Sequence, residues 1–473
     1  MPRPSNPRAW LAFGLAALAA PLLAGCLMGP NYRRPAVAAP PAYRGAAPTP
    51  PAPGAASLGA ERWPAVFRDP VLQRLIRTAL ARNYDLRIAA TRVVEAQAEL
   101  GITRGAELPT AAAGASLFAE RNPKISHVFP AYTVKAGGFN LNAVWNLDFW
   151  GRYRRQTEAA RAQLLATRWG RRAVRATVVA GVAAAYFQLR ALDLELGIAR
   201  RTLAAHQDSL RLERVLQAHG GASLLQVRAA QELVYQAAEQ IPLLQRAGAQ
   251  QEDAIRLLLG ENPGPIPRGW TLAQQPNPPA VPAGLPSQLL ERRPDILEAE
   301  ANLIAANADI GVAKADFFPR ITLTGLGGLE SYALNQLFHG NARQWNTNLS
   351  VSQPIFEAGV LRNGLRFTEA QKQQMVLAYQ QAIHQAFRQV SDALIALHRD
   401  HQYATQQRLL TRAAADVERL SEVRYRHGGA SYLEVLTNQT NYFAAQLNLA
   451  QAQLDERLAL VEVYTALGGG WKP

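Results

Sequence analysis

The distribution of proline most constrains what this chain of 473 residues can fold into. Of its 30 prolines, nine fall between Pro30 and Pro64 and nine between Pro263 and Pro294. These two segments are expected to be extended, structureless connectors. Residues 131–241 and 355–472 contain no proline and are rich in Ala, Leu, Gln, Arg and Glu, which are good helix formers.

The run from Arg152 to Ala218 predicts one continuous helix of 67 residues, about 100 Å long at 1.5 Å per residue. A helix of that length does not fit a compact globule, so the run predicts a coiled-coil element. The longest apolar run, Trp10 to Ala24, is too short to span a bilayer comfortably. The sequence therefore excludes a multi-span helical membrane protein.

Two segments of the chain recur at nearly one spacing. Residues 216–227 match residues 424–435 at an offset of 208, and residues 98–104 match residues 308–314 at an offset of 210. Matches in order at nearly one offset indicate a tandem duplication. Each half then has a helix, two strands, a long helix, a His-Gly-Gly turn and a return helix.

Apolar and polar residues alternate in the segments predicted to be strands. The pattern runs over residues 138–149 and recurs over 345–352, each preceded by another strand-like segment near 110–121 and 320–331. This period suits a transmembrane β-strand, and equally a soluble half-buried sheet. Four strands cannot close a barrel in lipid, so either the sheet is soluble or several chains share one barrel. The candidate membrane-interface anchors are Trp145, Trp150 and Trp345.

The N-terminus predicts a secretory signal. Arg3 and Arg8 precede an apolar run that ends in Leu23-Ala24-Gly25-Cys26, and Cys26 is the only cysteine. Small residues before a lone cysteine are typical of a bacterial lipoprotein, so we expect lipidation of Cys26; an ordinary signal peptide containing a cysteine is the alternative. Leu27, rather than Asp, after the cysteine favours the outer membrane of a Gram-negative cell.

Composition excludes several classes of function. One cysteine leaves no internal disulfide and no cysteine-cluster metal site. The net charge of +14 comes from scattered arginine and is assigned to no site, so we expect no nucleic-acid partner. His398 and His401 give a weak metal signal for which solvated surface is the simpler interpretation. We expect no catalytic residue, metal or cofactor, and no phosphate-binding loop appears in the sequence.

Several motifs together resemble the outer membrane factor family, the TolC/OprM-like efflux channels, and within it the NodT-type lipoproteins. They are Gly25 to Pro35, Phe67 to Gln73, Leu285 to Ile296, Ile310 to Ile321 and Ala466 to Trp471. The resemblance covers nearly the whole mature chain. It implies a mixed α/β membrane protein: a homotrimer with a 12-stranded outer-membrane β-barrel, four strands per chain, continued by a long periplasmic α-helical barrel with internal duplication.

On this interpretation the chain divides into six segments. They are a lipoprotein signal peptide (1–25), a proline-rich tether (26–66), a first repeat (67–259, β-hairpin 108–150, tip near 219–223), a proline-rich linker (260–294), a second repeat (295–467, β-hairpin 319–356, tip near 427–431) and a C-terminal tail (468–473).

The resemblance also assigns candidate site residues. Tyrosine, arginine and acidic groups near the second tip hold the family's aperture closed; Tyr425 and Glu434 match that pattern, whereas Thr437 replaces the second acid and Ala430 the arginine. With these departures the chain lacks two members of the family's charge latch, and Glu434 on a solvated helix face is the alternative. The tip glycines expected to dock an adaptor are Gly220, Gly221, Gly428 and Gly429.

The implied function is a passive exit channel of a tripartite efflux system. It would carry drugs, toxicants or metal ions outward, with iris-like gating at the periplasmic tip. Its implied partners are a periplasmic adaptor, an inner-membrane proton-driven pump and outer-membrane lipid. Two alternatives stay open: the exit duct of a one-step protein secretion system, and a periplasmic coiled-coil adaptor.

Overall fold

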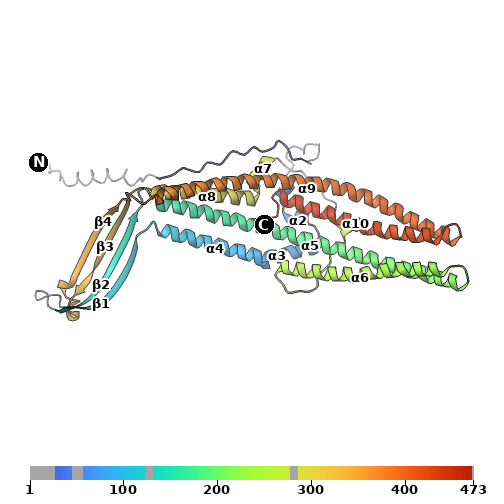
Figure 1. The fold of residues 1–473 in the computed structure, drawn as a ribbon, viewed down its shortest axis with the longest axis horizontal. Coiled ribbons are helices and arrows are strands. Elements are labelled where there is room, and N and C mark those ends of the chain that lie inside the picture. The colour runs from blue at the N-terminus through green and yellow to red at the C-terminus, as the bar shows by residue number, and fades with distance from the viewer. Residues whose placement is uncertain (1–26, 45–56, 124–130, 277–285, 471–473) are drawn as a thin grey trace, which may run out of the picture. The chain divides into compact units, whose positions relative to one another are not determined.

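The computed structural model describes residues 27–44, 57–123, 131–276 and 286–470. This part of the chain is rich in helix and contains one four-stranded sheet (Figure 1). Two helices, α5 (Arg152–Ala218) and α9 (Val360–Arg426), each have 67 residues. Each turns back into a shorter helix, α6 (Leu224–Leu259) or α10 (Tyr432–Ala466). The expected long helices and return helices are therefore present.

The two hairpins match each other in register. The differences 360 − 152 and 426 − 218 both give 208, the offset found between the repeated tip sequences. A stretch of α5 is long and apolar enough to cross a membrane by composition, and 56% of that stretch is buried. Val182, Tyr186 and Leu189 on the same helix are fully buried, so α5 contributes to the core of the helical bundle.

Shorter helices complete the chain. They are η1 (Leu58–Ala60), α2 (Trp63–Val66), α3 (Pro70–Arg82), α4 (Tyr84–Gly105), η2 (Leu272–Gln274), α7 (Pro286–Arg292), α8 (Pro294–Ala315), η3 (Leu334–Gln336) and η4 (Gly340–Ala342). The second proline-rich segment thus differs from the expected structureless linker, because it contains α7. Proline at the first position of a helix has its missing N–H where no hydrogen bond is required, which explains how α7 and α8 both begin with proline.

The sheet is antiparallel, in the order β1 (Thr110–Asn122), β2 (Tyr132–Leu147), β3 (Arg320–Ser331) and β4 (Arg343–Ser352). The pairing of Leu323 with both Trp145 and Leu349 fixes which residues share a face. One face is largely apolar over all four strands and the other is largely polar. The first carries Ala113, Leu117, Phe139, Leu141, Trp145, Leu323, Leu329, Trp345, Leu349 and Val351; the second carries Ser116, Asn140, Asn142, Asn146, Thr322, Thr324, Asn346, Asn348 and Ser350.

Contacts divide the chain into two compact units. One comprises residues 1–36, 92–167 and 298–379 and contains the sheet; the other comprises residues 37–91, 168–297 and 380–473 and contains both helix tips. Each unit takes segments from both sequence repeats. The repeats are therefore interleaved in space, and neither forms a compact body of its own.

The first described residues lie along the sheet-bearing unit. The amide of Met28 donates to the carbonyl of Trp150 at 3.1 Å, and the buried Arg155 guanidinium donates to the carbonyl of Met28 and to Asn31 Oδ1. Gly29 has a φ of +87° and packs so closely on Gly311 that a side chain would collide with it. Cys26 lies outside the described residues, but the segment that follows it is held at the junction of β2 and α5.

Candidate functional site

The two helix tips form the candidate site, and glycine makes both turns. Gly220 has a φ of +76° and Gly428 a φ of +74°, a left-handed conformation that glycine adopts without strain. The amide after each donates back into the helix that ends there, from Gly221 to the Leu216 carbonyl and from Gly429 to the Arg424 carbonyl, both at 2.8 Å. The tips are therefore two copies of one helix-ending motif.

The caps of the return helices differ between the tips. At the first, Ser223 and Gln226 form a reciprocal capping box, in which each side chain accepts from the other's backbone amide. At the second, Ser431 Oγ accepts from the Glu434 amide, but the Glu434 carboxylate pairs with Arg424 Nη1 at 3.2 Å. The second tip therefore uses its carboxylate to tie α10 to α9.

Tyr425 links the two hairpins. Its hydroxyl donates to Glu213 Oε1 on α5 at 2.9 Å, and Glu213 is fully buried. Burial raises the pKa of the Glu213 carboxyl, against the effect of the tyrosine hydrogen bond. Burial and the neighbouring carboxylate raise the pKa of the Tyr425 hydroxyl, so it stays a donor at ordinary pH. The ring of Tyr425 lies 5.3 Å from that of Tyr432.

Apolar packing surrounds this hydrogen bond, where α5, α6 and α10 meet. We call this contact region the hairpin seam; its buried apolar members are Leu210, Val227, Ala230, Val234, Tyr432 and Val435. The hydroxyls of Ser209 and Tyr432 lie 3.3 Å apart. In the first repeat the residue equivalent to Tyr432 is Leu224, which is exposed. The seam therefore makes the two tips unequal, since only the second inserts its first return-helix residue into the contact.

The structure brings together some of the predicted gate residues and adds others. Tyr425 lies in the seam and Glu434 beside it, whereas Thr437 is exposed and donates to the Leu433 carbonyl of its own helix. Sequence reasoning missed Glu213 and Arg424. The signal for Glu213 was a carboxylate three residues after Leu210, on the apolar face of its helix. Gate roles for Tyr425, Glu434 and Thr437 stay predictions.

The three predicted interface tryptophans have different surroundings. Trp145 Nε1 donates to the Glu107 carbonyl at 3.1 Å, and Trp345 is 81% exposed on the same sheet face. Trp150 follows β2, stacks on Phe318 at 4.8 Å and donates to the Pro319 carbonyl. Trp150 thus helps fix the strand–helix junction, and membrane anchoring by all three stays a prediction.

His398 and His401 lie on the surface of α9, and His401 also contacts a buried carboxylate. His401 Nδ1 lies 2.6 Å from Glu456 Oε1, and Arg408 donates to the other oxygen of this fully buried carboxylate. Both histidines are exposed, as a surface position predicts, and the contact with Glu456 gives His401 a partner in addition. Across the described residues, no group of three or more His, Cys, Asp and Glu is placed to hold a metal ion.

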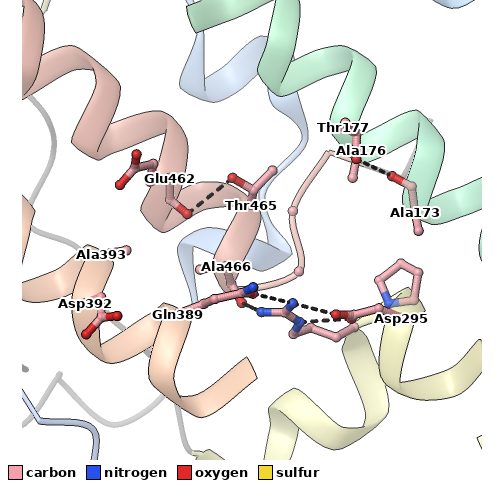
Figure 2. Close-up of a pocket in the computed structure, with 14 residues that line it drawn as sticks. Ala173, Ala176, Thr177, Asp295, Gln389, Asp392, Ala393, Glu462, Thr465 and Ala466 are labelled. Atoms are coloured by element: carbon pink, nitrogen blue, oxygen red, sulfur yellow. Dashed lines mark hydrogen bonds and ion pairs between the residues drawn. The ribbon is translucent and has the colours of Figure 1, made fainter. Parts of the chain in front are cut away.

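A cavity of about 420 Å³ opens among α5, α8, α9 and α10 (Figure 2). Arg293 lines this cavity. Its buried guanidinium donates to Asp295 Oδ2 at 2.6 Å, Gln389 Oε1 at 2.7 Å and the Ala466 carbonyl at 3.1 Å. Because these donors are committed to the protein itself, the arginine serves to join three helices.

The fold and its paired tips are those of outer-membrane channels. The structure of the Neisseria gonorrhoeae MtrE outer membrane channel in its open state matches with a TM-score of 0.86 at 30% identity, over 94% of this chain and 99% of that one. Among curated relatives, the cation efflux system protein CusC of Escherichia coli is 35% identical over 95% of this chain and 97% of its own length. The toluene efflux pump outer membrane protein TtgF of Pseudomonas putida is 37% identical over 95% of each chain.

The family follows from the sequence as well. The pattern of the family described as outer membrane efflux protein matches residues 75–261 and 285–469. This chain belongs to that family, and it is an outer-membrane efflux channel.

Proposed function

We propose that three copies of this chain share one 12-stranded β-barrel, each giving its four strands, with the helical hairpins continuing as a periplasmic α-helical barrel. The exposed apolar face of the sheet carries this proposal. Leu141, Leu349 and Val351 are more than half exposed on it, and no described element covers them. β1 and β4 also each leave one edge without a partner strand among the described residues. Lipid satisfies the apolar face, and only pairing between copies satisfies the edges.

The polar face would line a wet lumen. Asparagine, serine and threonine alternate with the lipid-facing residues on β2, β3 and β4, as a water-filled barrel requires. Transport through this duct is passive conduction, with no bond made or broken. The energy comes from an inner-membrane proton-driven pump, reached through a periplasmic adaptor.

The hairpin seam and the second tip form the gate. The Tyr425–Glu213 hydrogen bond ties the second hairpin to α5, and the Arg424–Glu434 pair stiffens the second tip. Iris-like opening would separate the hairpins at these contacts. Leu225 and Leu433, at equivalent positions beyond the tip glycines, are 77% and 71% exposed and offer apolar contacts to the adaptor.

Lipidation of Cys26 would add a tether. Met28, two residues after the cysteine, is held at the strand–helix junction by the hydrogen bond from its amide to the Trp150 carbonyl. The cargo class follows from the relatives, whose names refer to cation and toluene efflux. We infer hydrophobic toxicants or metal ions as cargo.

Gene deletion and complementation test the function. Cells lacking the chain should become sensitive to a hydrophobic toxicant or metal ion, and the wild-type chain should restore resistance. Leu433→Asp, at an exposed position, should still form trimers in detergent but fail to restore resistance. Unchanged susceptibility together with lost protein secretion would contradict the efflux proposal.

A further inference from the structure

The hairpin seam buries polar atoms that its contacts do not satisfy. Within the described part of the chain, three such atoms lie close to the gate: His206 Nδ1, Glu213 Oε2 and Gln439 Oε1. All three residues are buried. His206 and Glu213 lie on α5 and Gln439 lies on α10, where its amide affects the pKa of His206. His206 and Gln439 therefore belong to the same two hairpins that the Tyr425–Glu213 hydrogen bond joins, and His206 Nδ1 and Gln439 Oε1 have no hydrogen-bond partner among the described residues.

Unsatisfied buried atoms favour separation of the hairpins. A buried polar atom without a partner loses the hydrogen bonds that water would give it, and it regains them when the seam opens. The apolar members of the seam and the tyrosine hydrogen bond oppose this tendency. Some groups in the seam thus favour packed hairpins and others favour separated ones, so a change in the charge of His206 shifts the equilibrium between the two states.

We propose that His206 and Gln439 form a second, proton-sensitive latch of the gate: the seam packs with His206 neutral and separates when His206 is protonated. The inference deepens the proposed gate and rests on it. A neutral imidazole is compatible with burial against an amide and apolar side chains. An imidazolium needs solvation or a carboxylate partner, and separation of the hairpins supplies water.

The packed helices bring three titratable groups besides His206 into the seam, and none of them sets the pKa of His206 through its charge. Glu213 lies on its own helix, Tyr425 comes from α9 and Tyr432 from α10, whereas α6 contributes the apolar Val227, Ala230 and Val234. Burial lowers the pKa of the His206 imidazole below its usual 6.5, while the Gln439 amide acts in the opposite direction. The packed seam therefore binds a proton more weakly than the separated one.

The sign follows from this difference. Proton binding by His206 does not favour separation above pH 6.5, and its full effect is reached as the pH falls through the lowered pKa of the packed seam. Glu213 acts in the opposite sense, because burial raises its carboxyl pKa and acidification favours the buried neutral form. Both tyrosine pKa values are raised, so the tyrosines stay protonated throughout. A variant of His206 itself is needed to isolate its effect.

The test is the open probability of the trimer in planar bilayers between pH 7.5 and pH 5.0. His206→Gln keeps a polar side chain but removes the titration. The ratio of wild-type to His206→Gln open probability should rise as the pH falls below about 6.5, by up to about tenfold per pH unit for each coupled histidine. His384→Gln, at an exposed position on α9 away from the tip, should leave the wild-type response unchanged. A wild-type to His206→Gln ratio that does not change with pH would overturn the inference.

Two further variants separate this inference from the gate proposal. Tyr425→Phe should raise the open probability at pH 7.5. If it does, and the ratio of wild-type to His206→Gln open probability does not change with pH, the latch is wrong and the proposed gate at Tyr425 is supported. If Tyr425→Phe has the open probability of the wild type while the ratio of wild-type to His206→Gln open probability rises at low pH, the latch is supported and the role of Tyr425 in the gate is refuted. If His206→Gln forms no trimer, Gln439→Leu is measured instead. A rise in open probability that extends to lower pH than in the wild type supports the latch. An open probability that depends on pH as in the wild type overturns it.

Discussion

At the scale of single residues, one buried carboxylate fastens the proline-rich linker to the helices. Asp69 is fully buried, and it caps α3 by accepting from the Val71 amide at 2.8 Å. It also accepts from the Tyr186 hydroxyl at 3.0 Å, the Trp270 amide at 2.9 Å and Gln275 Nε2 at 3.0 Å. One side chain therefore satisfies donors from a helix start, a long helix and the linker.

Asp69→Ala should destabilise the protein by on the order of 3 kcal/mol, because it leaves several buried donors without an acceptor. The measurement is the unfolding midpoint of the detergent-solubilised protein, followed by circular dichroism. Asp253→Ala, at an exposed position on α6, is the matched control and should have little effect. Equal midpoints for the two variants would contradict the role of Asp69.

The side chains that pair with the predicted gate residues were the part of the site that the sequence predicted least well. The family pattern identified Tyr425, but its acceptor Glu213 lies 212 residues away and is chosen by how the hairpins pack. Arg424 was missed because the expected arginine position, after the glycines, holds Ala430. The cation instead precedes the turn and reaches Glu434 across it. Sequence spacing along one helix does not predict contacts across a turn or between hairpins.

At the scale of elements, the tips show how a turn is specified. Gly428 needs a left-handed backbone, whereas Gly429 does not, and a side chain on either would have room. Gly428→Ala should therefore lower the stability of the folded tip by about 1 kcal/mol, through backbone strain alone.

Hydrogen exchange of peptides covering residues 420–435 measures this effect. Exchange should be faster in Gly428→Ala and close to wild type in Gly429→Ala, which differs only in position. Similar protection in both variants would show that the left-handed conformation does not stabilise the tip.

Long elements were predictable because their signals are repeated many times along the chain. Absence of proline and helix-forming composition over 67 residues predicted α5, and period-two alternation predicted β2 and β4. Short elements had no such signal. Proline density suggested no structure between Pro263 and Pro294, yet α7 forms there, since proline is tolerated in the first turn of a helix.

At the scale of the whole molecule, the sheet has one exposed apolar face and, among the residues that the structure describes, two edges without a partner strand. One row of directly paired residues crosses all four strands on the polar face. In it Thr110 pairs with Val144, Val144 with Thr324, and Thr324 with Asn348. β1 runs from the helical end of the sheet and β4 runs back to it. The β4 edge of one copy can therefore pair antiparallel with the β1 edge of the next, which closes a ring.

Crosslinking between these edges tests the shared barrel most directly. A chain carrying both Thr110→Cys and Asn348→Cys is treated in membranes with a bismaleimide whose spacer tolerates a shift in register. Each single variant serves as a control for reaction elsewhere. We predict a covalent trimer from the double variant and dimers at most from the single variants. A double variant that stays monomeric, while both cysteines react with a monofunctional maleimide, would contradict the shared barrel.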